Sequence, residues 1–305
     1  NVRVMNGLSK LGLSLLALCV SLVITGILIA ICGYNPFEIY SALFIESFSS
    51  QSSVALVLSE SMPLIFAGLA FVVGIKVGLV NVGVEGQMLS GAMCAAIVGA
   101  YCTWLPGPIL ILACLLAGMI GGGLTFLLCT YLKSRFGASE VITCIMMNNI
   151  MDKVTEWLCN GPLKPEGVSI GQTKEITEAA YLTAIIPRTK LTWAFPLAVL
   201  CCIVIYVVME KTVIGYEMRI TGTNRIASVV AGIRTNRIYY LATCLSGAFA
   251  GLGGAGLVMG IYHRFIDGIT SGVGFVGVSV AALAAYSPLA VPISGALFGM
   301  LSAAT

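Results

Sequence analysis

Polar side chains set within apolar sequence are the residues of this chain that could do chemistry. The first group lies in residues 77–87, VGLVNVGVEGQ, and contains Asn81, Glu85 and Gln87. Glycines weaken a helix here, and a charge at mid-bilayer costs about 2.5–3.5 kcal/mol on insertion scales. Glu85 should therefore face protein, water or a solute, which favours a discontinuous helix lining a solute pathway. The alternative is a cytoplasmic turn in which Glu85 is solvated.

A second polar group follows Ser139-Glu140 and comprises Asn148, Asn149, Asp152, Lys153 and Glu156. Positions 148, 152 and 156 share one helical face, and positions 149 and 153 lie on the adjacent face. Amides on an interior face could hydrogen-bond a hydroxylated or heterocyclic solute. Equally, Lys153 and Glu156 could form an i,i+3 ion pair near the outer membrane interface.

The third group is a basic, mixed-polarity segment, residues 215–234, between two apolar runs. It is predicted to be a short amphipathic cytoplasmic element. Such an element can act only as a topology determinant, or it can dock into a groove of a partner protein. The residues singled out within it are Gly215, Glu217, Arg219, Gly222, Asn224 and Gly232.

Several enzyme signatures are missing or misleading. Residues 251–256 match GxGxxG, but the dinucleotide fingerprint needs a preceding strand; these glycines, with Gly247 and Gly260, instead favour close helix packing. No GxxxxGK[ST] occurs, so the chain has no P-loop for ATP. The single His263 has no partnered nucleophile, which disfavours an embedded enzyme. The 11 cysteines include no CxxC pair and suit packing rather than metal binding.

The elements that must position these groups are transmembrane helices. Only 10% of the 305 residues are charged and 58% are hydrophobic, whereas a soluble chain carries roughly 25% charged residues. Residues 11–33, 86–132, 238–262 and 268–305 contain no charge, and a helix needs about 20 apolar residues to cross a bilayer. We predict one domain, residues 1–305, that is all-α: a polytopic transmembrane bundle of about eight to ten spans, some short or broken.

The spans are predicted from apolar length and breaker residues. They lie near residues 11–32, 54–75, 86–101, 108–132, 139–158, 192–209, 238–262, 272–286 and 289–305. Residues 34–53 and 102–107 are then external loops. The chain starts without Met and stops inside an apolar run, so we expect that a terminal span is missing from it.

Orientation follows from the distribution of Lys and Arg. With a cytoplasmic N-terminus, the basic residues at 3, 10, 76, 133, 135 and 211–237 all lie inside, while the two short external loops contain none. The external segment 159–191 is mixed in charge. The positive-inside rule thus places the N-terminus in the cytoplasm. The first apolar run is too long for a cleaved secretory signal and is predicted to be retained.

In this order, the segments resemble permease subunits of ABC importers of the branched-chain amino acid, ribose and nucleoside class, closest to the nucleoside (purine) type. Residues 81–89, NVGVEGQML, resemble that branch's Asn-Ile-Gly-x-Glu-Gly-Gln motif, and residues 139–142, SEVI, with 146–149, resemble its Asn-Glu-Val-Ile segment. Residues 215–232 are similar to the family's cytoplasmic coupling stretch. Residues 246–254, 272–275 and Pro288 continue the likeness.

The resemblance implies a transport subunit in a bacterial cytoplasmic (inner) membrane, importing nucleosides or related small polar solutes by alternating access. The implied partners are a second permease subunit, a cytoplasmic ATP-binding subunit gripping residues 215–232, and an external solute-binding (lipo)protein. ATP and Mg would be held by the ATP-binding subunit, with no cofactor on this chain. Phe275 joins the predicted substrate pathway through the same resemblance. A net charge of +3 is too slight to indicate nucleic acid.

A rival hypothesis is a self-contained secondary transporter or channel driven by an ion gradient. Intramembrane acids such as Glu85 and Asp152 would serve such a protein as ion or proton sites.

Overall fold

The computed structural model describes residues 2–303, and it describes the side chains of residues 12, 16 and 19–303. The side chains of Arg3 and Lys10, on which part of the predicted orientation depends, lie outside this description, as does the end of the last predicted span. Within the described part the protein is all-α, with two isolated β-bridges, Gln172–Ile266 and Ala184–Thr192.

The helices follow one another with short connections, apart from a long segment between α6 and α7. They are α1 (Val2–Ile31), α2 (Pro36–Phe48), α3 (Gln51–Ile75), α4 (Val84–Tyr101), α5 (Gly107–Phe136), α6 (Glu140–Asn160), η1 (Glu178–Ala180), α7 (Ala194–Lys211), α8 (Val213–Thr223), α9 (Arg225–Val230), α10 (Thr235–Leu257), the π-helical turn η2 (Val258–Tyr262), α11 (Val273–Leu283) and α12 (Val291–Ala303).

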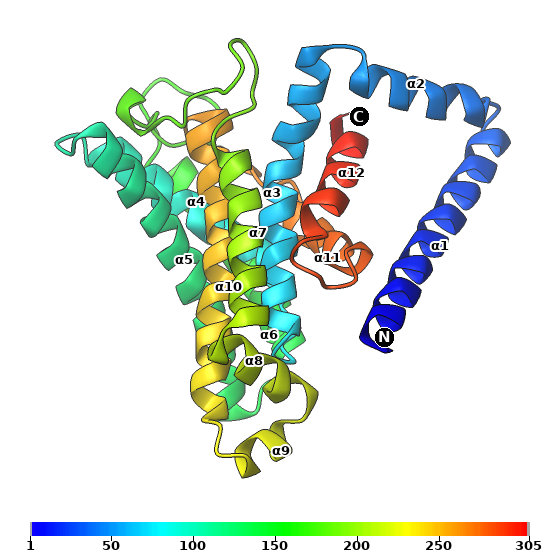
Figure 1. Ribbon diagram of the computed structural model, residues 1–305. Helices are drawn as coiled ribbons and strands as arrows, with labels where there is room; N and C mark the ends of the chain where they lie inside the picture. Colours follow the sequence, from blue (N-terminus) through cyan, green and yellow to red (C-terminus); the bar gives the residue numbers. More distant parts are fainter. Residues whose placement is uncertain (1, 304–305) are drawn as a thin grey trace.

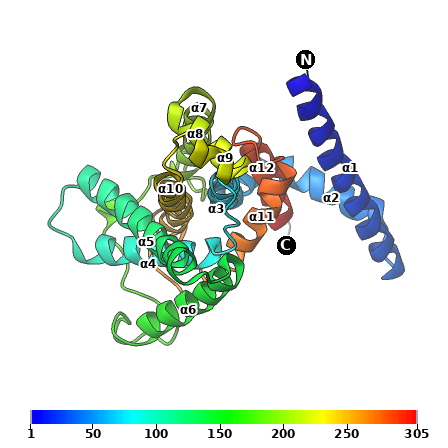
Figure 2. The ribbon, with the colours of Figure 1, turned by 90° about the horizontal axis from the view of Figure 1, so that it is seen from below.

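Helices α3 and α10 form the centre of the bundle. Helix α10 packs against α3, α4 and α5, while α3 also packs against α11 and α12. Figures 1 and 2 show α8 and α9 projecting from one end of the bundle, and α1 and α2 standing to one side of it. The chain bends by 119° between the apolar part of α1, Cys19–Ile31, and α2, so residues 2–48 form a bent arm beside the body (Figure 1).

Glycines bring α4, α5 and α10 into backbone contact. A Cβ at Gly251 would collide with the backbone of Gly118, and a Cβ at Gly254 would collide with the carbonyl of Met88. Residues 251–256 lie inside α10 with no strand before them. The close-packing interpretation of the GxGxxG match is therefore confirmed.

Among the described residues, four helices are long and apolar enough to cross a membrane. They are Gln51–Ile75, Gly107–Phe136, Ala194–Lys211 and the continuous Thr235–Tyr262, and the bent pair Cys19–Ile31 with Pro36–Phe48 adds a fifth if it counts as one span. The predicted count of about eight to ten spans is not confirmed by this criterion. One reason is that α11 and α12 have 11 and 13 residues, whereas crossing a bilayer takes about 20.

The predicted external loop 34–53 is wrong in part, because α2 occupies most of it. Asn35 caps this helix: its Oδ1 accepts a hydrogen bond from Phe37 N, and Pro36 occupies the first helical turn. These are ordinary helix-start signals. They were missed because the segment was assigned from its place between two apolar runs.

Candidate functional site

A polar core lies at the broken connection between α3 and α4. The side chains of Asn81 and Gln87 are fully buried and bond to each other reciprocally: Asn81 Nδ2 donates to Gln87 Oε1 at 2.9 Å, and Gln87 Nε2 donates to Asn81 Oδ1 at 2.7 Å. Gly78 begins the reversal with a φ of 80°, a conformation that favours glycine. Asn81 Oδ1 also accepts from Gly83 N at 3.1 Å, so this side chain satisfies a backbone donor that the interrupted helix leaves without a helical partner.

This amide pair is tied to the central helices through Ser246 of α10. Asn81 Nδ2 donates to Ser246 Oγ at 2.8 Å, and Ser246 Oγ donates to the carbonyl of Ala70 in α3 at 2.6 Å. The connection is therefore fixed to both α3 and α10. Ser246 was singled out in the sequence only within the resembling stretch 246–254. Its role was missed because a lone serine in an apolar helix carries no signal of its partner.

Asn148 joins α6 to the same connection. Its Oδ1 accepts from Gly86 N at 2.9 Å, and its Nδ2 donates to the carbonyl of Val82 at 3.0 Å. A Cβ at Gly86 would lie 2.9 Å from the Cα of Asn148, so this approach requires glycine. Asn148 therefore holds helices α4 and α6 together in this structure.

Glu85 joins the starts of two helices. It lies in the first turn of α4, and its carboxylate also accepts hydrogen bonds from residues at and just before the start of α11. The donors are Gly272 N to Oε1 at 3.0 Å, Gly274 N to Oε2 at 2.6 Å, and the hydroxyl of Thr270 to Oε1. A carboxylate is stabilised at a helix N-terminus by the unpaired N–H groups and the helix dipole. With Glu85 8% exposed, the solvated-turn alternative is wrong.

The outer face of α6 has a different character. Asp152, Lys153 and Glu156 have side chains that are 48%, 73% and 42% exposed, and Lys153 Nζ lies 3.4 Å from Asp152 and 2.6 Å from Glu156. The predicted i,i+3 ion pair is thus present. It occupies a helix whose opposite side is buried in the bundle.

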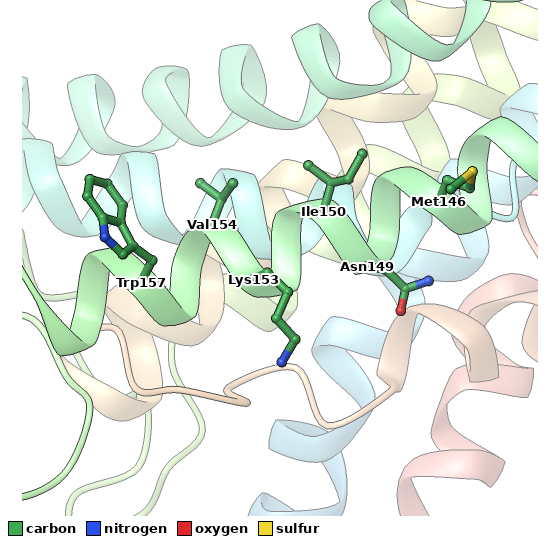
Figure 3. Close-up of a pocket in the computed structure, with 6 residues that line it drawn as sticks. All are labelled: Met146, Asn149, Ile150, Lys153, Val154 and Trp157. Atoms are coloured by element: carbon green, nitrogen blue, oxygen red, sulfur yellow. The ribbon is translucent and has the colours of Figure 1, made fainter.

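A shallow hollow of about 510 Å³ runs along the neighbouring face of α6, which shares Lys153 with the charged group and is otherwise lined mainly by apolar side chains. In Figure 3, Asn149 and Lys153 point one way from the helix while Ile150 and Val154 point the other. The amide of Asn149 donates within the described residues only to the carbonyl of Ile145, at 3.0 Å. The hollow is lined by Met146, Asn149, Ile150, Lys153, Val154 and Trp157.

The segment that leads from η2 to α11 faces the same charged group. Burial raises the pKa of Asp267 on this segment, and the carboxylates of Glu156 and Asp152 raise it further.

Phe275, in the first turn of α11, is 48% exposed. The structure therefore divides the predicted pathway residues. Asn81, Glu85, Gln87 and Asn148 are brought together in a buried core, whereas Asn149 and Phe275 lie on the surface.

The segment predicted to couple to a partner forms α8 and α9. Two of its glycines are required by packing: a Cβ at Gly215 would collide with Met209 of α7, and a Cβ at Gly222 would collide with the carbonyl of Lys76, where α3 ends. Arg219 donates to the carbonyl of Met209 and pairs with Glu210 at 3.0 Å. These contacts seat α8 against the ends of α3 and α7.

The remaining residues of this segment shape its turns. The Oδ1 of Asn224 caps α9 by accepting from Ala227 N at 3.0 Å. Gly232 has a φ of 81° and an open environment, so its requirement for glycine is conformational. Glu217 lies half-buried on α8.

A small aromatic and ionic group was not anticipated at the other end of the bundle. The rings of Tyr181 and His263 stack with centroids 3.8 Å apart, and the hydroxyl of Tyr181 donates to Glu175 at 2.8 Å. Burial raises the pKa of Tyr181 to about 12, with a contribution from the Glu175 carboxylate. Burial also lowers the pKa of His263 below its ordinary value. The group ties the long segment before α7 to the end of η2.

Within the described residues no group of three or more His, Cys, Asp or Glu side chains could hold a metal ion. The described residues thus form three features: buried hydrogen bonds between polar groups of different helices, an exposed face of α6 with charged side chains, and the amphipathic helix α8 packed against the ends of α3 and α7.

Comparison with known proteins gives concordant matches. The protein family described as "Branched-chain amino acid transport system / permease component" matches residues 53–305. A guanosine ABC transporter permease protein, NupP of Bacillus subtilis, is 31% identical over 299 residues, covering 96% of this chain and 85% of that protein. A nucleoside ABC transporter permease protein, NupB of Lactococcus lactis, is 30% identical over 97% of this chain and 84% of its own length.

A glucose ABC transporter permease protein, TsgB13 of Haloferax volcanii, is 29% identical over 95% of this chain and 79% of its own length. No solved structure gives a significant match.

Proposed function

This chain belongs to the family of branched-chain amino acid transport system permease components, and from that premise we propose that it is the membrane-spanning subunit of an ATP-driven importer of nucleosides or related small polar solutes. Its relatives are named as transport components and not as enzymes. The proposed solute class is based on the nucleoside and guanosine permeases among these relatives. The glucose permease, which is similarly related, supports a sugar instead.

The observation that carries the proposal is the exposed polar face of α6. A helix of 21 residues is about 31 Å long, and Asp152 and Lys153 lie about 18–20 Å from its start by the same rise per residue. Ionised side chains at that depth are unfavourable in lipid and mark water-filled paths or protein contacts. We assign the hollow along α6, with Asn149 and Phe275, to the wall of the solute pathway.

The buried polar core then serves the pathway by positioning its wall. Asn81, Gln87 and Asn148 hold the start of α4 against α6 and α10, and Glu85 holds the start of α11. In this proposal these residues set the conformation of the broken helices, and solute passes along their outer side. Broken helices at mid-membrane are common at transporter binding sites.

For the membrane topology, we propose about eight to ten spans. Helices α4 and α6 cross next to the four long apolar helices, and α11 with α12 forms one broken crossing sheltered by α3. Irregular backbone at membrane depth is tolerated where protein surrounds it. The N-terminus lies in the cytoplasm, and so do α8 and α9.

For the partners, we propose a second permease subunit, a cytoplasmic ATP-binding subunit that carries ATP and Mg, and an external solute-binding (lipo)protein. The ATP-binding subunit would hold α8 and α9. Because Gly222 lies against the carbonyl of Lys76, a displacement of α8 would act directly on the connection that leads to Asn81 and Glu85. This is a route from ATP hydrolysis to alternating access.

The test is uptake of radiolabelled guanosine by cells that express the complete transporter. We expect Asn149→Leu to reduce uptake at least tenfold, since a pathway amide is lost, while the complex still assembles. Ile142→Leu, at a position on the same helix that is 61% exposed, is the control and should leave uptake unchanged.

Unlabelled nucleosides should compete with the guanosine, and unlabelled glucose should not. Competition by glucose alone would contradict the solute assignment. Undiminished uptake in Asn149→Leu would contradict the placement of the pathway.

A further inference from the structure

Two cavities lie one above the other on the surface formed by α5 and α10. The upper one is an apolar groove of about 380 Å³, lined on α5 by residues such as Ile120 and Leu127 and on α10 by Cys244 and Ala248. The lower one is a polar cavity of about 190 Å³ at the end of the bundle from which α8 and α9 project, and it is lined by Lys133, Ser134, Arg225, Asn236, Tyr239 and Tyr240.

The two cavities share one helical face. On α10, Tyr240 of the polar cavity is followed at intervals of four residues by Cys244 and Ala248 of the groove, so the three stack along one side of the helix. On α5 the groove extends from Leu116 to Leu127, which is about 16–17 Å along the axis at 1.5 Å per residue. The hydrocarbon of one leaflet is about 15 Å thick, half of a core of about 30 Å. The groove therefore has the length of acyl chain in a single leaflet.

The polar cavity holds more hydrogen-bond donors than acceptors. Arg225 donates through Nη2 to Asn236 at 3.0 Å, and its guanidinium lies 5.3 Å from the ring centroid of Tyr239. An arginine has five N–H donors, and the others have no acceptor among the described residues. The guanidinium is thus positioned by its ring and amide contacts with most of its donors unused.

Lys133 contributes the second positive charge. Its Nζ donates to Glu140 at 2.8 Å and to the hydroxyl of Tyr239 at 2.6 Å, which leaves one of its three donors. Glu140 is the one acid in contact with this group among the described residues, so two cations face one carboxylate. An anion with several acceptor oxygens matches both the charge and the donors, and arginine in particular suits phosphate.

We propose that the two cavities form a binding site for one anionic phospholipid of the leaflet on the α8–α9 side. The phosphate bonds to Arg225 and Lys133 between the two tyrosines, and an acyl chain lies in the groove between α5 and α10. Both helices are long and apolar enough to cross the membrane, so the polar cavity lies at the depth where hydrocarbon meets headgroups. Tyrosine is enriched at that depth. This site is separate from the α6 face assigned to solute.

The experiment is native mass spectrometry of the full chain, purified in a mild non-ionic detergent and titrated with phosphatidylglycerol or phosphatidylcholine. We expect one phosphatidylglycerol to bind, with at least fivefold preference over phosphatidylcholine, since each basic residue near an anionic lipid contributes about 1 kcal/mol. Arg225→Gln should remove that preference. Arg135→Gln is the control. It also removes one positive charge, from the last turn of α5 near Lys133 but outside the cavity, and should preserve the preference for phosphatidylglycerol.

A second variant, Cys244→Trp, fills the groove without changing charge and should weaken phosphatidylglycerol binding at least fivefold. It also keeps the test open if Arg225→Gln does not fold. Equal binding of the two lipids, or equal effects of Arg225→Gln and Arg135→Gln, would overturn the proposal. So would displacement of the lipid by millimolar inorganic phosphate, which indicates a soluble anion site. Loss of the lipid when the ATP-binding subunit is added would assign the cavity to that protein contact and would also overturn it.

Discussion

The contact between Glu85 and the start of α11 allows a quantitative prediction. In Glu85→Gln the side chain keeps its size, and its carbonyl oxygen can still accept from Gly272 N and the hydroxyl of Thr270. The new amide nitrogen, however, would face Gly274 N, and two donors cannot bond to each other. The variant therefore loses one charge-assisted hydrogen bond and the negative charge at the start of α11.

The size of the effect follows from these two losses. A hydrogen bond to a charged group contributes about 1.5–3 kcal/mol, and a charge at a helix N-terminus contributes about 0.3–1 kcal/mol. Together they amount to about 2–3 kcal/mol, because both contributions count the same lost negative charge and overlap in part. At about 1.4 kcal/mol for each factor of ten, local opening of α11 should become about 30- to 150-fold more frequent.

Hydrogen exchange measured by mass spectrometry on the full chain in detergent tests this prediction. The amides of α11 should exchange about 30- to 150-fold faster in Glu85→Gln, and guanosine uptake by the complete transporter should fall in parallel. Glu38→Gln is the matched control, since Glu38 also lies in the first turn of a helix, α2, but is exposed. Unchanged exchange in α11 would refute the capping role of Glu85, whatever happened to uptake.

Three further outcomes are expected. Gly222→Ala should push α8 away from the end of α3 and abolish solute-stimulated ATPase activity in an assembled complex. The substitution Thr223→Ala, at the neighbouring exposed position, should leave this activity unchanged. Normal stimulation in Gly222→Ala would argue against coupling through α8. Gly251→Ala should lower thermal stability by about 1–3 kcal/mol through overpacking of α5 against α10, and an unchanged Tm would show that the helices are not in backbone contact. Because burial lowers the pKa of His263, the folded state binds fewer protons than the unfolded state, so stability present above about pH 6.5 should fall on acidification. His263→Gln should reduce the Tm difference between pH 7.5 and pH 5.5, since no other histidine is present; an equal difference in both proteins would contradict this.

Much of the helical framework could be predicted from the sequence. Long apolar runs located α3, α5, α7 and α10 to within a few residues, because their signal is local and strong. The glycine pattern in α10 predicted backbone contact between helices, and the basic segment predicted a short amphipathic element where α8 and α9 lie. In each of these cases the residue types of one segment, without knowledge of its partners, are enough to indicate its environment: lipid or protein core for apolar runs, close helix contact for glycines and the cytoplasm for basic residues.

The remaining features depend on partners that are distant in sequence. Glu85 was predicted to face protein, water or a solute, but its partners, Thr270, Gly272 and Gly274, are more than 180 positions away. Asn148 and Asn149 are neighbours of the same type, yet one is buried between helices and the other lies in the exposed hollow. Adjacent helical positions differ by about 100° in direction, and only the packing of α6 decides which amide faces the bundle.

The central claim is that this chain carries solute only as part of an ATP-driven assembly, and transport in proteoliposomes tests it most directly. The chain should be reconstituted alone and together with its second permease and ATP-binding subunits, with the solute-binding protein supplied on the opposite side. We predict that radiolabelled guanosine accumulates only in the complete assembly with ATP and Mg, and that ionophores which dissipate ion gradients have no effect. Accumulation by the chain alone, driven by a proton or sodium gradient, would contradict the account and support a secondary transporter.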